Sequence, residues 1–437
     1  MLRDNNKRSR PGIKKGNPMT TTRSAFPEGG QNWPELQREI RNRAAGDLDW
    51  EHGRTPLFVF RNDQETYEIG RNAYFECFSE NALGRKRAFF GIASMERDVL
   101  DYGLSLFNAP ESGEGAFTTG GTESIFIAMK AAREAYRHKH PEMRGQILNI
   151  VVPITVHPAF DKAADAMDLE ILRAPLREDK RVDVAEMKKL VNEKTIALVG
   201  SAPCFPHGVV DPIDELSAVA LEADVWLHVD ACVGGWIAPF FTRIGRPTPH
   251  FDFRYEGVRS ISADLHKFGF CPKPASTVFY RAADDLERAT FKSDSWPNGP
   301  FATPTLVGTR PGGAVAGAWA VLNHLGTKGY EDAARRLGEM TDRYCEGILE
   351  IEGMELWAKP DLSLINYGSN DFDIFLVSEK MVARGWLSGL TRRPKGMHAM
   401  MSLLHDASRD EFLSDLHECV EIARKSPKIE AKIEAKY

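Results

Sequence analysis

The chain has 437 residues, of which 42% are hydrophobic and 27% are charged, and its formal net charge is −6. This composition is ordinary for a globular protein with one large and one smaller domain. The negative net charge gives no general attraction to nucleic acid or anionic membranes, so we expect a small-molecule partner. No uncharged apolar run reaches the ~20 residues of a membrane-spanning helix, and the N-terminus lacks the apolar core of a signal peptide, so we expect a cytoplasmic protein without a membrane span. The six cysteines form no CxxC pair, so we expect neither a disulfide framework nor a zinc cluster.

The N-terminal residues 1–30 are rich in Arg, Lys, Asn, Pro, Thr and Gly and contain almost no large apolar residues. Such a segment buries too little surface to offset its chain entropy, which predicts a disordered basic tail. Its KRSRPGIKK run could contact nucleic acid or anionic lipid. A solvated tail, or sequence upstream of an internal start at Met19, is the favoured interpretation.

The next part of the chain alternates between helical and strand-like patterns. Apolar residues recur at helical spacing from Ser94 to Leu106, and TTGGTESIFIAMKAAREAYR then predicts a turn followed by an amphipathic helix. Short apolar runs follow (ILNIVVPI, IALVG, VWLHVD, SISAD, STVFYR), with helical patterns between them (FDKAADAMDL, IDELSAVALEA). This alternation predicts an α/β fold whose mostly parallel central sheet is covered on both faces.

The pattern changes from about Pro311 to longer helices, AVAGAWAVLNHL and YEDAARRLGEMTDRYCEGIL. Two short strands are predicted near Leu362 and Phe372, and a last helix from Arg409 to about Lys425. These elements are typical of a smaller α+β domain. The predicted division of the chain is a tail (1–30), an N-terminal segment (31–93), a large domain (94–310) and a C-terminal small domain (311–437).

Two ionisable residues stand at strand ends, where ligands of parallel sheets bind. Lys267, in SISADLHKFGF, is flanked by aromatic residues rather than charges, and burial would depress its pKa and make it a better nucleophile. Asp230 ends the apolar run VWLHVDA, a position where an acid is normally avoided. The alternative for Asp230 is a carboxylate that caps the following turn.

Two further features complete the candidate site. Gly120, Gly121 and Thr122 precede a helix whose backbone N–H groups can bind phosphate, although Thr122 could equally be an ordinary N-cap. His157, after a strand-like run, could stack on an aromatic ring or play a structural role. An amine, an anion, a phosphate cradle and a flat partner are what pyridoxal 5'-phosphate requires of a protein.

The order GGT, His157, Asp230 and His266-Lys267 resembles that of the pyridoxal-phosphate-dependent group II decarboxylases and, more closely, the sphingosine-1-phosphate lyases. The likeness extends over roughly residues 70–425, through TTGGTESI, TVHPAFDKAA, SAPCFPHGVVDPI, HVDACVGG, SISADLHKFGFCPK, ATPTLVGTRPGG and FDIFLVSEKMVARGW. It implies the type I fold of pyridoxal-phosphate-dependent transferases. It also implies a homodimer with the active site at the interface, to which the segment 31–93 contributes.

The resemblance implies a role for each matching position. Lys267 would be the Schiff-base lysine, Asp230 the partner of the pyridine nitrogen and His157 the stacking residue. Phosphate contacts would come from Gly121, Thr122 and His266, beside Gly120, and from Gly308 and Thr309 of the neighbouring subunit.

Two basic stretches depart from the family pattern. In NALGRKRAFFG the family's histidine position is Gly84, and three cations follow it, while TRRPKGMH stands where the family is largely neutral. These cations predict contact with an anionic group of the substrate, which puts a long-chain sphingoid substrate in doubt. The alternative is that they are solvent-exposed charges on loops without a role in binding. The substrate-binding candidates are Asn81, Arg85, Arg87 and Arg392, with Lys86, Arg393 and Lys395 as further possibilities.

The leading functional prediction is a carbon–carbon lyase that cleaves a phosphorylated amino alcohol to an aldehyde and an amine. An amino-acid decarboxylase is the alternative, because the same cofactor accepts electrons from a breaking carboxylate bond. A binding or regulatory protein of the same fold is disfavoured, because Lys267 and Asp230 are both present. No metal is predicted, since the pairs His138/His140 and His398/His405 have no supporting cluster of ligands.

Overall fold

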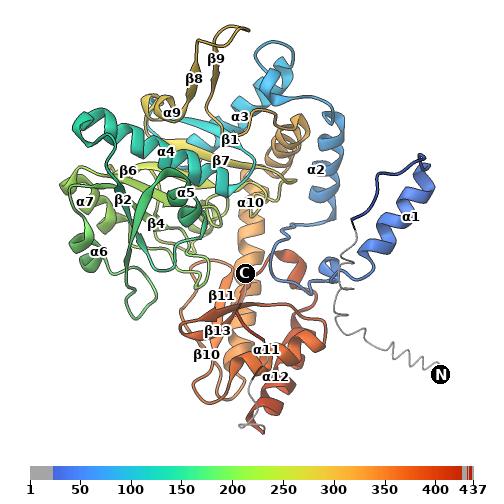
Figure 1. Cartoon of the computed structure of the whole chain (residues 1–437). Coiled ribbons are helices and arrows are strands. Elements are labelled where there is room, and N and C mark those ends of the chain that lie inside the picture. Colours follow the sequence, from blue (N-terminus) through green and yellow to red (C-terminus); the bar gives the residue numbers. More distant parts are fainter. Residues whose placement is uncertain (1–22, 426–430, 432, 436–437) are drawn as a thin grey trace.

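The computed structural model describes residues 23–425, 431 and 433–435. Most of the predicted basic tail therefore lies outside the described residues, and residues 23–30 are exposed and form no helix or strand. The body of the molecule is the expected α/β architecture, with a seven-stranded sheet above a smaller antiparallel sheet (Figure 1).

The large sheet has the strand order β1-β7-β6-β5-β4-β2-β3. Strand β7 is antiparallel to both of its neighbours, and all other pairs are parallel. Four of these strands, β2, β4, β5 and β7, are buried along their whole length because both faces of the sheet are covered. Their bounds are β1 (Glu114–Thr118), β2 (Leu148–Pro153), β3 (Leu169–Ala174), β4 (Thr195–Ser201), β5 (Trp226–Asp230), β6 (Val258–Ala263) and β7 (Ser276–Tyr280).

Helices on the two faces of the sheet form two apolar cores. One core contains residues of α4, α5 and α9, and the other contains residues of α3, α7 and α8 and continues into the C-terminal part. The bounds are α3 (Phe90–Leu106), α4 (Gly121–Lys139), α5 (Ala159–Met167), α6 (Val184–Leu190), α7 (Ile213–Ala223), α8 (Ala238–Arg243) and α9 (Ala283–Ala289). The predicted type I fold is thus the fold observed.

A long helix, α10 (Gly312–Leu349), connects the two parts of the molecule. The two helices expected here are one element interrupted at Gly326, whose φ is 54°. Before this break α10 packs against α2 (Gln64–Glu76) and α3. After it, Tyr330 of α10 stacks on Phe240 of α8, and the rest of the helix approaches α12 (Arg409–Arg424) and the small sheet. The division at residue 310 stays a prediction.

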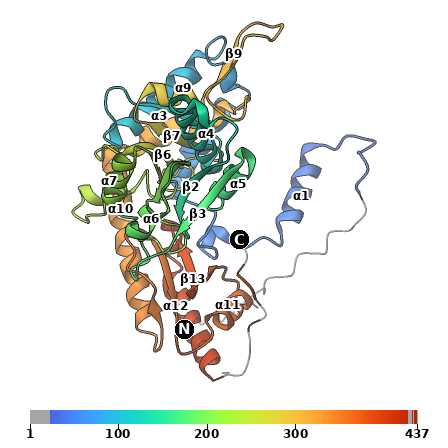
Figure 2. The same ribbon diagram turned by 60° about the vertical axis from the view of Figure 1, so that its left-hand side comes forward.

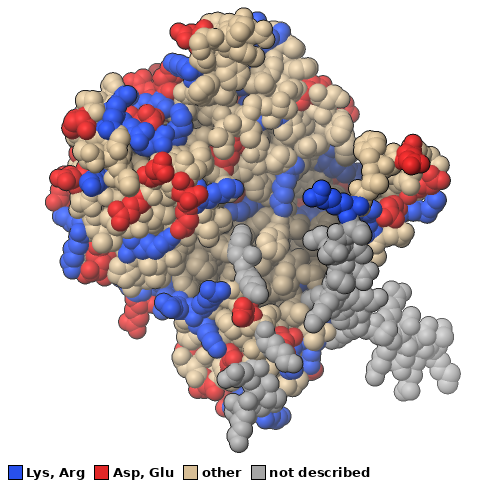
Figure 3. Space-filling model, in the orientation of Figure 1, with Lys and Arg blue, Asp and Glu red and all other residues tan. Residues whose placement is uncertain are grey.

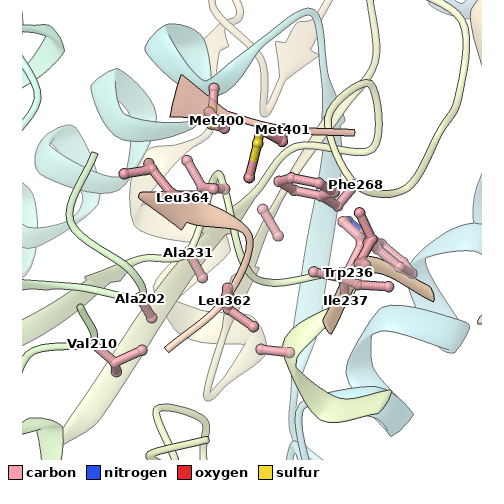
Figure 4. Close-up of a cluster of buried hydrophobic side chains, with 14 of the residues drawn as sticks. Ala202, Val210, Ala231, Trp236, Ile237, Phe268, Leu362, Leu364, Met400 and Met401 are labelled. Atoms are coloured by element: carbon pink, nitrogen blue, oxygen red, sulfur yellow. The ribbon is translucent and has the colours of Figure 1, made fainter. Parts of the chain in front are cut away.

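The small sheet has the order β10-β11-β13-β12 and is antiparallel throughout. Its strands are β10 (Glu355–Leu356), β11 (Leu364–Gly368), β12 (Gly389–Arg392) and β13 (Lys395–Met400), packed with α11 (Ile374–Ala383) and α12. The strand expected near Phe372 is wrong, because Asp373 accepts a hydrogen bond from the Phe375 amide and so caps α11 there. Figure 4 shows Leu364 and Met400 packing with Ala202 and Ala231 of the large domain.

The N-terminal segment contains α1 (Trp33–Ala44), which has no buried residue and stands away from the body in both ribbon views (Figures 1 and 2). The remaining elements are the hairpin of β8 (Phe291–Ser293) and β9 (Phe301–Thr303) and four short 3-10 helices: Trp50–His52, Ala82–Gly84, Pro141–Met143 and Leu403–His405. Within the described ranges, no helix is long and apolar enough to cross a membrane.

Candidate active site

A cavity of about 310 Å³ lies at the carboxyl ends of the parallel strands. Parallel sheets bind ligands there because the strand-to-helix turns converge at that edge. Seven of the residues singled out in the sequence line it together: Gly120, Gly121, Thr122, His157, Asp230, His266 and Lys267. Sequence reasoning missed other lining residues, among them Leu57, Phe58, Phe60, Ser201, Phe205, Cys232, Asp264, Lys273 and Met400.

The start of α4 forms one wall of the cavity. Gly120 is the N-cap and has no side chain to donate or accept, and Thr122 lies inside the helix, so the alternative of Thr122 as N-cap is wrong. A Cβ atom added at Gly120 would meet only His266 Cε1, at 3.9 Å, so the space in front of this glycine is open. The free N–H groups of the first helical turn therefore stand beside open space, which suits an anion.

Glu123 of the same motif is buried and fixes the loop that leads into the helix. Its Oε2 accepts hydrogen bonds from the amide and the hydroxyl of Thr119, both at 2.7 Å. Its Oε1 accepts from the amides of Leu306 and Val307, at 2.9 and 3.1 Å. The carboxylate thus joins the glycine turn to the segment that precedes Gly308.

Asp230 is the last residue of β5, and its side chain is almost fully buried. Its Oδ1 accepts hydrogen bonds from the Cys232 amide at 3.1 Å and the Ser262 hydroxyl at 3.2 Å. These two bonds fix the orientation of the carboxylate in the cavity. The bond from the Cys232 amide is the turn-capping contact that the sequence left as an alternative. Because it uses only Oδ1, Asp230 can cap the turn and still contact a ligand.

Lys267 follows β6, and its Nζ lies 3.1 Å from Oδ2 of Asp264. Burial by itself lowers the pKa of Lys267, but Asp264, Cys232 and Asp230 outweigh this and raise it above the ordinary lysine value. The depressed pKa expected from the sequence is therefore wrong for the free amine. The physical reason is the adjacent carboxylate, whose position the sequence pattern did not reveal.

Burial lowers the pKa of both histidines of the cavity, His157 and His266, and so favours their neutral form. His157 Nδ1 accepts from the Ala159 amide at 3.1 Å, and His266 Nδ1 accepts from the Ala275 amide at 3.3 Å. In both rings the proton consequently sits on Nε2. Each ring is held in one orientation by the backbone of its own loop.

The other predicted residues lie outside this cavity. Asn81 Nδ2 donates to the Thr309 hydroxyl at 3.2 Å, next to Gly308. Arg85 Nε lies 3.4 Å from Glu96, whose other oxygen pairs with the buried Arg310.

Arg87 forms no ion pair with the residues that the structure describes, and Arg392 donates to the carbonyl of Ala435 at 2.8 Å. One cation that sequence reasoning did not select, Lys273, does line the cavity and donates to the carbonyl of Phe58. On the face shown in Figure 3, Lys and Arg side chains gather around the hollow in the middle of the molecule.

The residues of the cavity fit pyridoxal phosphate. Open space in front of Gly120 suits the phosphate, the fixed carboxylate of Asp230 suits a ring nitrogen, and a lysine amine is available for the aldehyde. The carboxylate of Asp264 retains one oxygen, Oδ1, without a hydrogen-bond partner in the described structure. The volume is in the range of sites that bind small molecules and cofactors.

This fold and this pocket define a pyridoxal-phosphate-dependent enzyme of fold type I. Residues 91–369 match the family described as the pyridoxal-dependent decarboxylase conserved domain. The chain is 37% identical over 407 residues to sphingosine-1-phosphate lyase 1 of Mus musculus, covering 92% of this chain and 71% of that protein. It is 33% identical over 415 residues to sphingosine-1-phosphate lyase of Oryza sativa, covering 93% and 76%.

A solved structure of sphingosine-1-phosphate lyase from Burkholderia pseudomallei superposes with a TM-score of 0.88 at 34% identity, covering 93% of this chain and 94% of that one. The chain belongs to the sphingosine-1-phosphate lyase family, within the pyridoxal-dependent decarboxylases. The predicted family, fold and cofactor are confirmed, and the protein is a pyridoxal-phosphate-dependent lyase.

Proposed function

We propose that the protein cleaves the carbon–carbon bond between the amine-bearing and hydroxyl-bearing carbons of a phosphorylated amino alcohol. The products are an aldehyde and a phosphorylated amine. One observation carries the proposal: a chain of this family brings Lys267, Asp230, His157 and the glycine turn to a single cavity. The substrate class is that of the lyases after which the relatives are named.

When bound, pyridoxal phosphate supplies an electron sink for the electrons of the breaking bond. Lys267 would hold the cofactor through its aldehyde carbon. The carboxylate of Asp230, fixed by Cys232 and Ser262, would keep a proton on the ring nitrogen. The ring of His157, which follows β2, would stack on the cofactor ring and orient it.

The phosphate of the cofactor is assigned to the start of α4. Gly120 and Gly121 allow close approach of the backbone, Thr122 adds a hydroxyl, and His266 Nε2 can donate from the opposite side. Gly308 and Thr309 are proposed to serve the cofactor of the neighbouring subunit. This is supported by their place outside the cavity of their own subunit.

A homodimer with the site at its interface is part of the proposal. The surface near Asn81 and Gly308 exposes large apolar side chains that a monomer would leave in water. They are Phe75, Phe78, Leu83, Phe90 and Leu306, exposed by 63%, 65%, 40%, 66% and 58%. A second copy that covers this surface would bring its own Thr309 toward the cavity.

We also propose that the substrate is anionic. Lys273 is the cation that lines the cavity beside Lys267, and burial together with Lys267 lowers the pKa of Lys273. An ammonium group at this position can form a charge-assisted hydrogen bond with an anionic group of the substrate. Asn81, Arg85, Arg87 and Arg392 remain candidates whose contacts require the second subunit.

A cytoplasmic location is a further part of the proposal. All six cysteines are free, and four of them are buried. Reduced thiols are typical of proteins that work in a reducing compartment.

The experiment that tests the reaction is a substrate panel of phosphorylated amino alcohols, their dephosphorylated analogues and free amino acids. Aldehyde and carbon dioxide are measured separately for each compound. The proposal expects aldehyde from the phosphorylated amino alcohols and no carbon dioxide. Carbon dioxide from an amino acid would instead support the decarboxylase, which the family's description favours as the second candidate.

A further inference from the structure

Asp264 is a buried carboxylate of the cavity to which the proposed reaction assigns no role. It follows β6 directly, three residues before Lys267, and its side chain is 3% exposed. Its Oδ2 lies 3.1 Å from Lys267 Nζ, whereas its Oδ1 has no hydrogen-bond partner in the described structure. A carboxylate in such surroundings is strongly unfavourable unless a cation compensates it, and Lys267 is the cation in contact.

The surrounding backbone prevents this carboxylate from moving away. The Asp264 amide donates to the Cys232 carbonyl at 3.3 Å, and its own carbonyl accepts from the Lys267 amide at 3.3 Å. A Cβ atom added at Gly121 would lie 3.0 Å from both carboxylate oxygens. The start of α4 therefore packs directly on Asp264, and its position is set by three elements of the large domain.

We infer that Asp264 is a positioning residue for Lys267: it holds the lysine nitrogen in the cavity and keeps that nitrogen protonated, also when it is bonded to the cofactor. The inference rests on the proposed function, because it takes Lys267 as the lysine that bonds the cofactor. The two carboxylates then have different roles: Asp230 interacts with the ring nitrogen of the cofactor, and Asp264 interacts with the nitrogen of Lys267. A protonated nitrogen makes the carbon bonded to it a better acceptor for the substrate amine.

Other titratable groups also face Lys267. Asp230 and Cys232 come from the end of β5, His157 from the end of β2, and His266 and Lys273 from the segment of Lys267 itself.

Burial lowers the pKa of both of these histidines and raises the pKa of the Cys232 thiol well above its ordinary value, which favours the uncharged form of all three groups. The charges that act on the nitrogen of Lys267 are consequently Asp264, Asp230 and Lys273. Asp264 has the shortest contact, and its removal should have the largest effect.

The test is a pH titration of the visible absorption band of the cofactor-loaded protein. In Asp264→Asn the midpoint of this titration should fall by about one pH unit or more, because the neutral amide no longer favours the protonated nitrogen. Asp264→Glu keeps the charge and should restore most of the shift. Asp285→Asn is the matched control, since Asp285 is an equally buried carboxylate that pairs with Arg259 outside the cavity; this variant should lose thermal stability without moving the midpoint.

Two results would overturn the inference. One is a folded Asp264→Asn protein that binds the cofactor and titrates at the wild-type midpoint. The other is a folded variant without a visible band, which would mean that Asp264 builds the cofactor site rather than tuning the lysine. Asp264→Ser undergoes the same titration if the Asn variant does not accumulate as folded protein. Failure of the proposed function is distinct, because it would appear in the substrate panel as carbon dioxide in place of aldehyde, whereas the titration depends only on the cofactor held by Lys267.

Discussion

At the scale of single residues, Asp230 combines a structural and a proposed chemical role. One of its oxygens is held by the Cys232 amide and the Ser262 hydroxyl, so the carboxylate cannot turn away from the cavity. Asp230→Asn should retain the cofactor, because the glycine turn and Lys267 are intact. Turnover should fall on the order of a hundredfold, since an amide cannot hold the proton on the ring nitrogen.

The measurement for Asp230→Asn is kcat together with the cofactor content from the absorption spectrum. Asp252→Asn is the matched control, because Asp252 is a buried carboxylate that pairs with Asn108 and Arg254 away from the cavity. Wild-type kcat in a folded, loaded Asp230→Asn protein would remove Asp230 from the mechanism.

The cations near the cavity can be separated by what each one contacts. Arg85 shares Glu96 with the buried Arg310. Arg85→Gln should therefore lower the stability of the folded protein, and its effect on activity should be the same whichever substrate is used. A cation that binds the substrate anion should instead lose about 1.5–3 kcal/mol of binding, a tenfold to hundredfold rise in KM, and only for the phosphorylated compound. We expect this result for Lys273→Gln.

The assay compares Arg85→Gln, Arg87→Gln, Arg392→Gln and Lys273→Gln, each with a phosphorylated substrate and its dephosphorylated analogue. The wild type sets the ratio of the two KM values. If all four variants raise the KM for both compounds equally, or for neither, then these cations do not bind the anionic group and substrate specificity comes from other residues.

At the scale of elements, the first turn of α4 is tightly packed at Gly121. A Cβ atom at Gly121 would lie 2.7 Å from Cys232 Sγ and 3.0 Å from the oxygens of Asp264. Gly121→Ala must push these groups apart at a cost of about 1–3 kcal/mol, and cofactor affinity should fall by roughly fivefold to a hundredfold. Titration of the apoprotein with cofactor measures this.

Gly91→Ala is the control for Gly121→Ala. Gly91 lies in α3, and a Cβ atom there would meet nothing within 4 Å. This variant should bind the cofactor as the wild type does. Equal affinities for Gly121→Ala and the wild type would place the phosphate elsewhere.

The sequence predicted those elements whose pattern is strong. Buried strands such as IALVG and VWLHVD are uninterrupted apolar runs, and α7 and α12 have helical periodicity, so both kinds were found. Strand β3 was missed because it lies at the sheet edge and carries exposed charges, and the β12–β13 hairpin because Pro394 and several cations interrupt it.

The same distinction holds for the site. The glycine turn, His157, Asp230 and Lys267 stand at strand ends within recognisable motifs, and the cavity brings them together. Phe58, Phe205 and Met400 lie on loops and on the small sheet, where only tertiary packing brings them to the cavity. Asp264 was in the predicted motif, but its contact with Lys267 depends on side-chain geometry that no spacing reveals.

At the scale of the whole molecule, the proposed dimer predicts complementation between two inactive variants. Lys267→Ala disables the cavity of its own subunit, whereas Gly308→Glu should repel the cofactor phosphate of the partner. Co-expressed, the two chains form heterodimers with one intact site, and activity should return. Each variant expressed alone should stay inactive.

Activity that does not return, although the mixed dimer is isolated by two affinity tags, would show that each subunit builds its site alone. Sedimentation of the wild type supplies the control for the oligomeric state. A monomer with full activity would contradict the dimer proposal as a whole.

The most direct test of the account is the visible spectrum of the Lys267→Ala protein beside the wild type, with turnover measured on the same samples. The wild type should be yellow and active, and the variant should lose both the absorption band of lysine-bound cofactor and its turnover. Lys130→Ala, which removes a half-buried lysine bonded to the carbonyl of Ala289 outside the cavity, should keep both. A Lys267→Ala protein that retains the band and full activity would contradict the assignment of this lysine and, with it, the site described above.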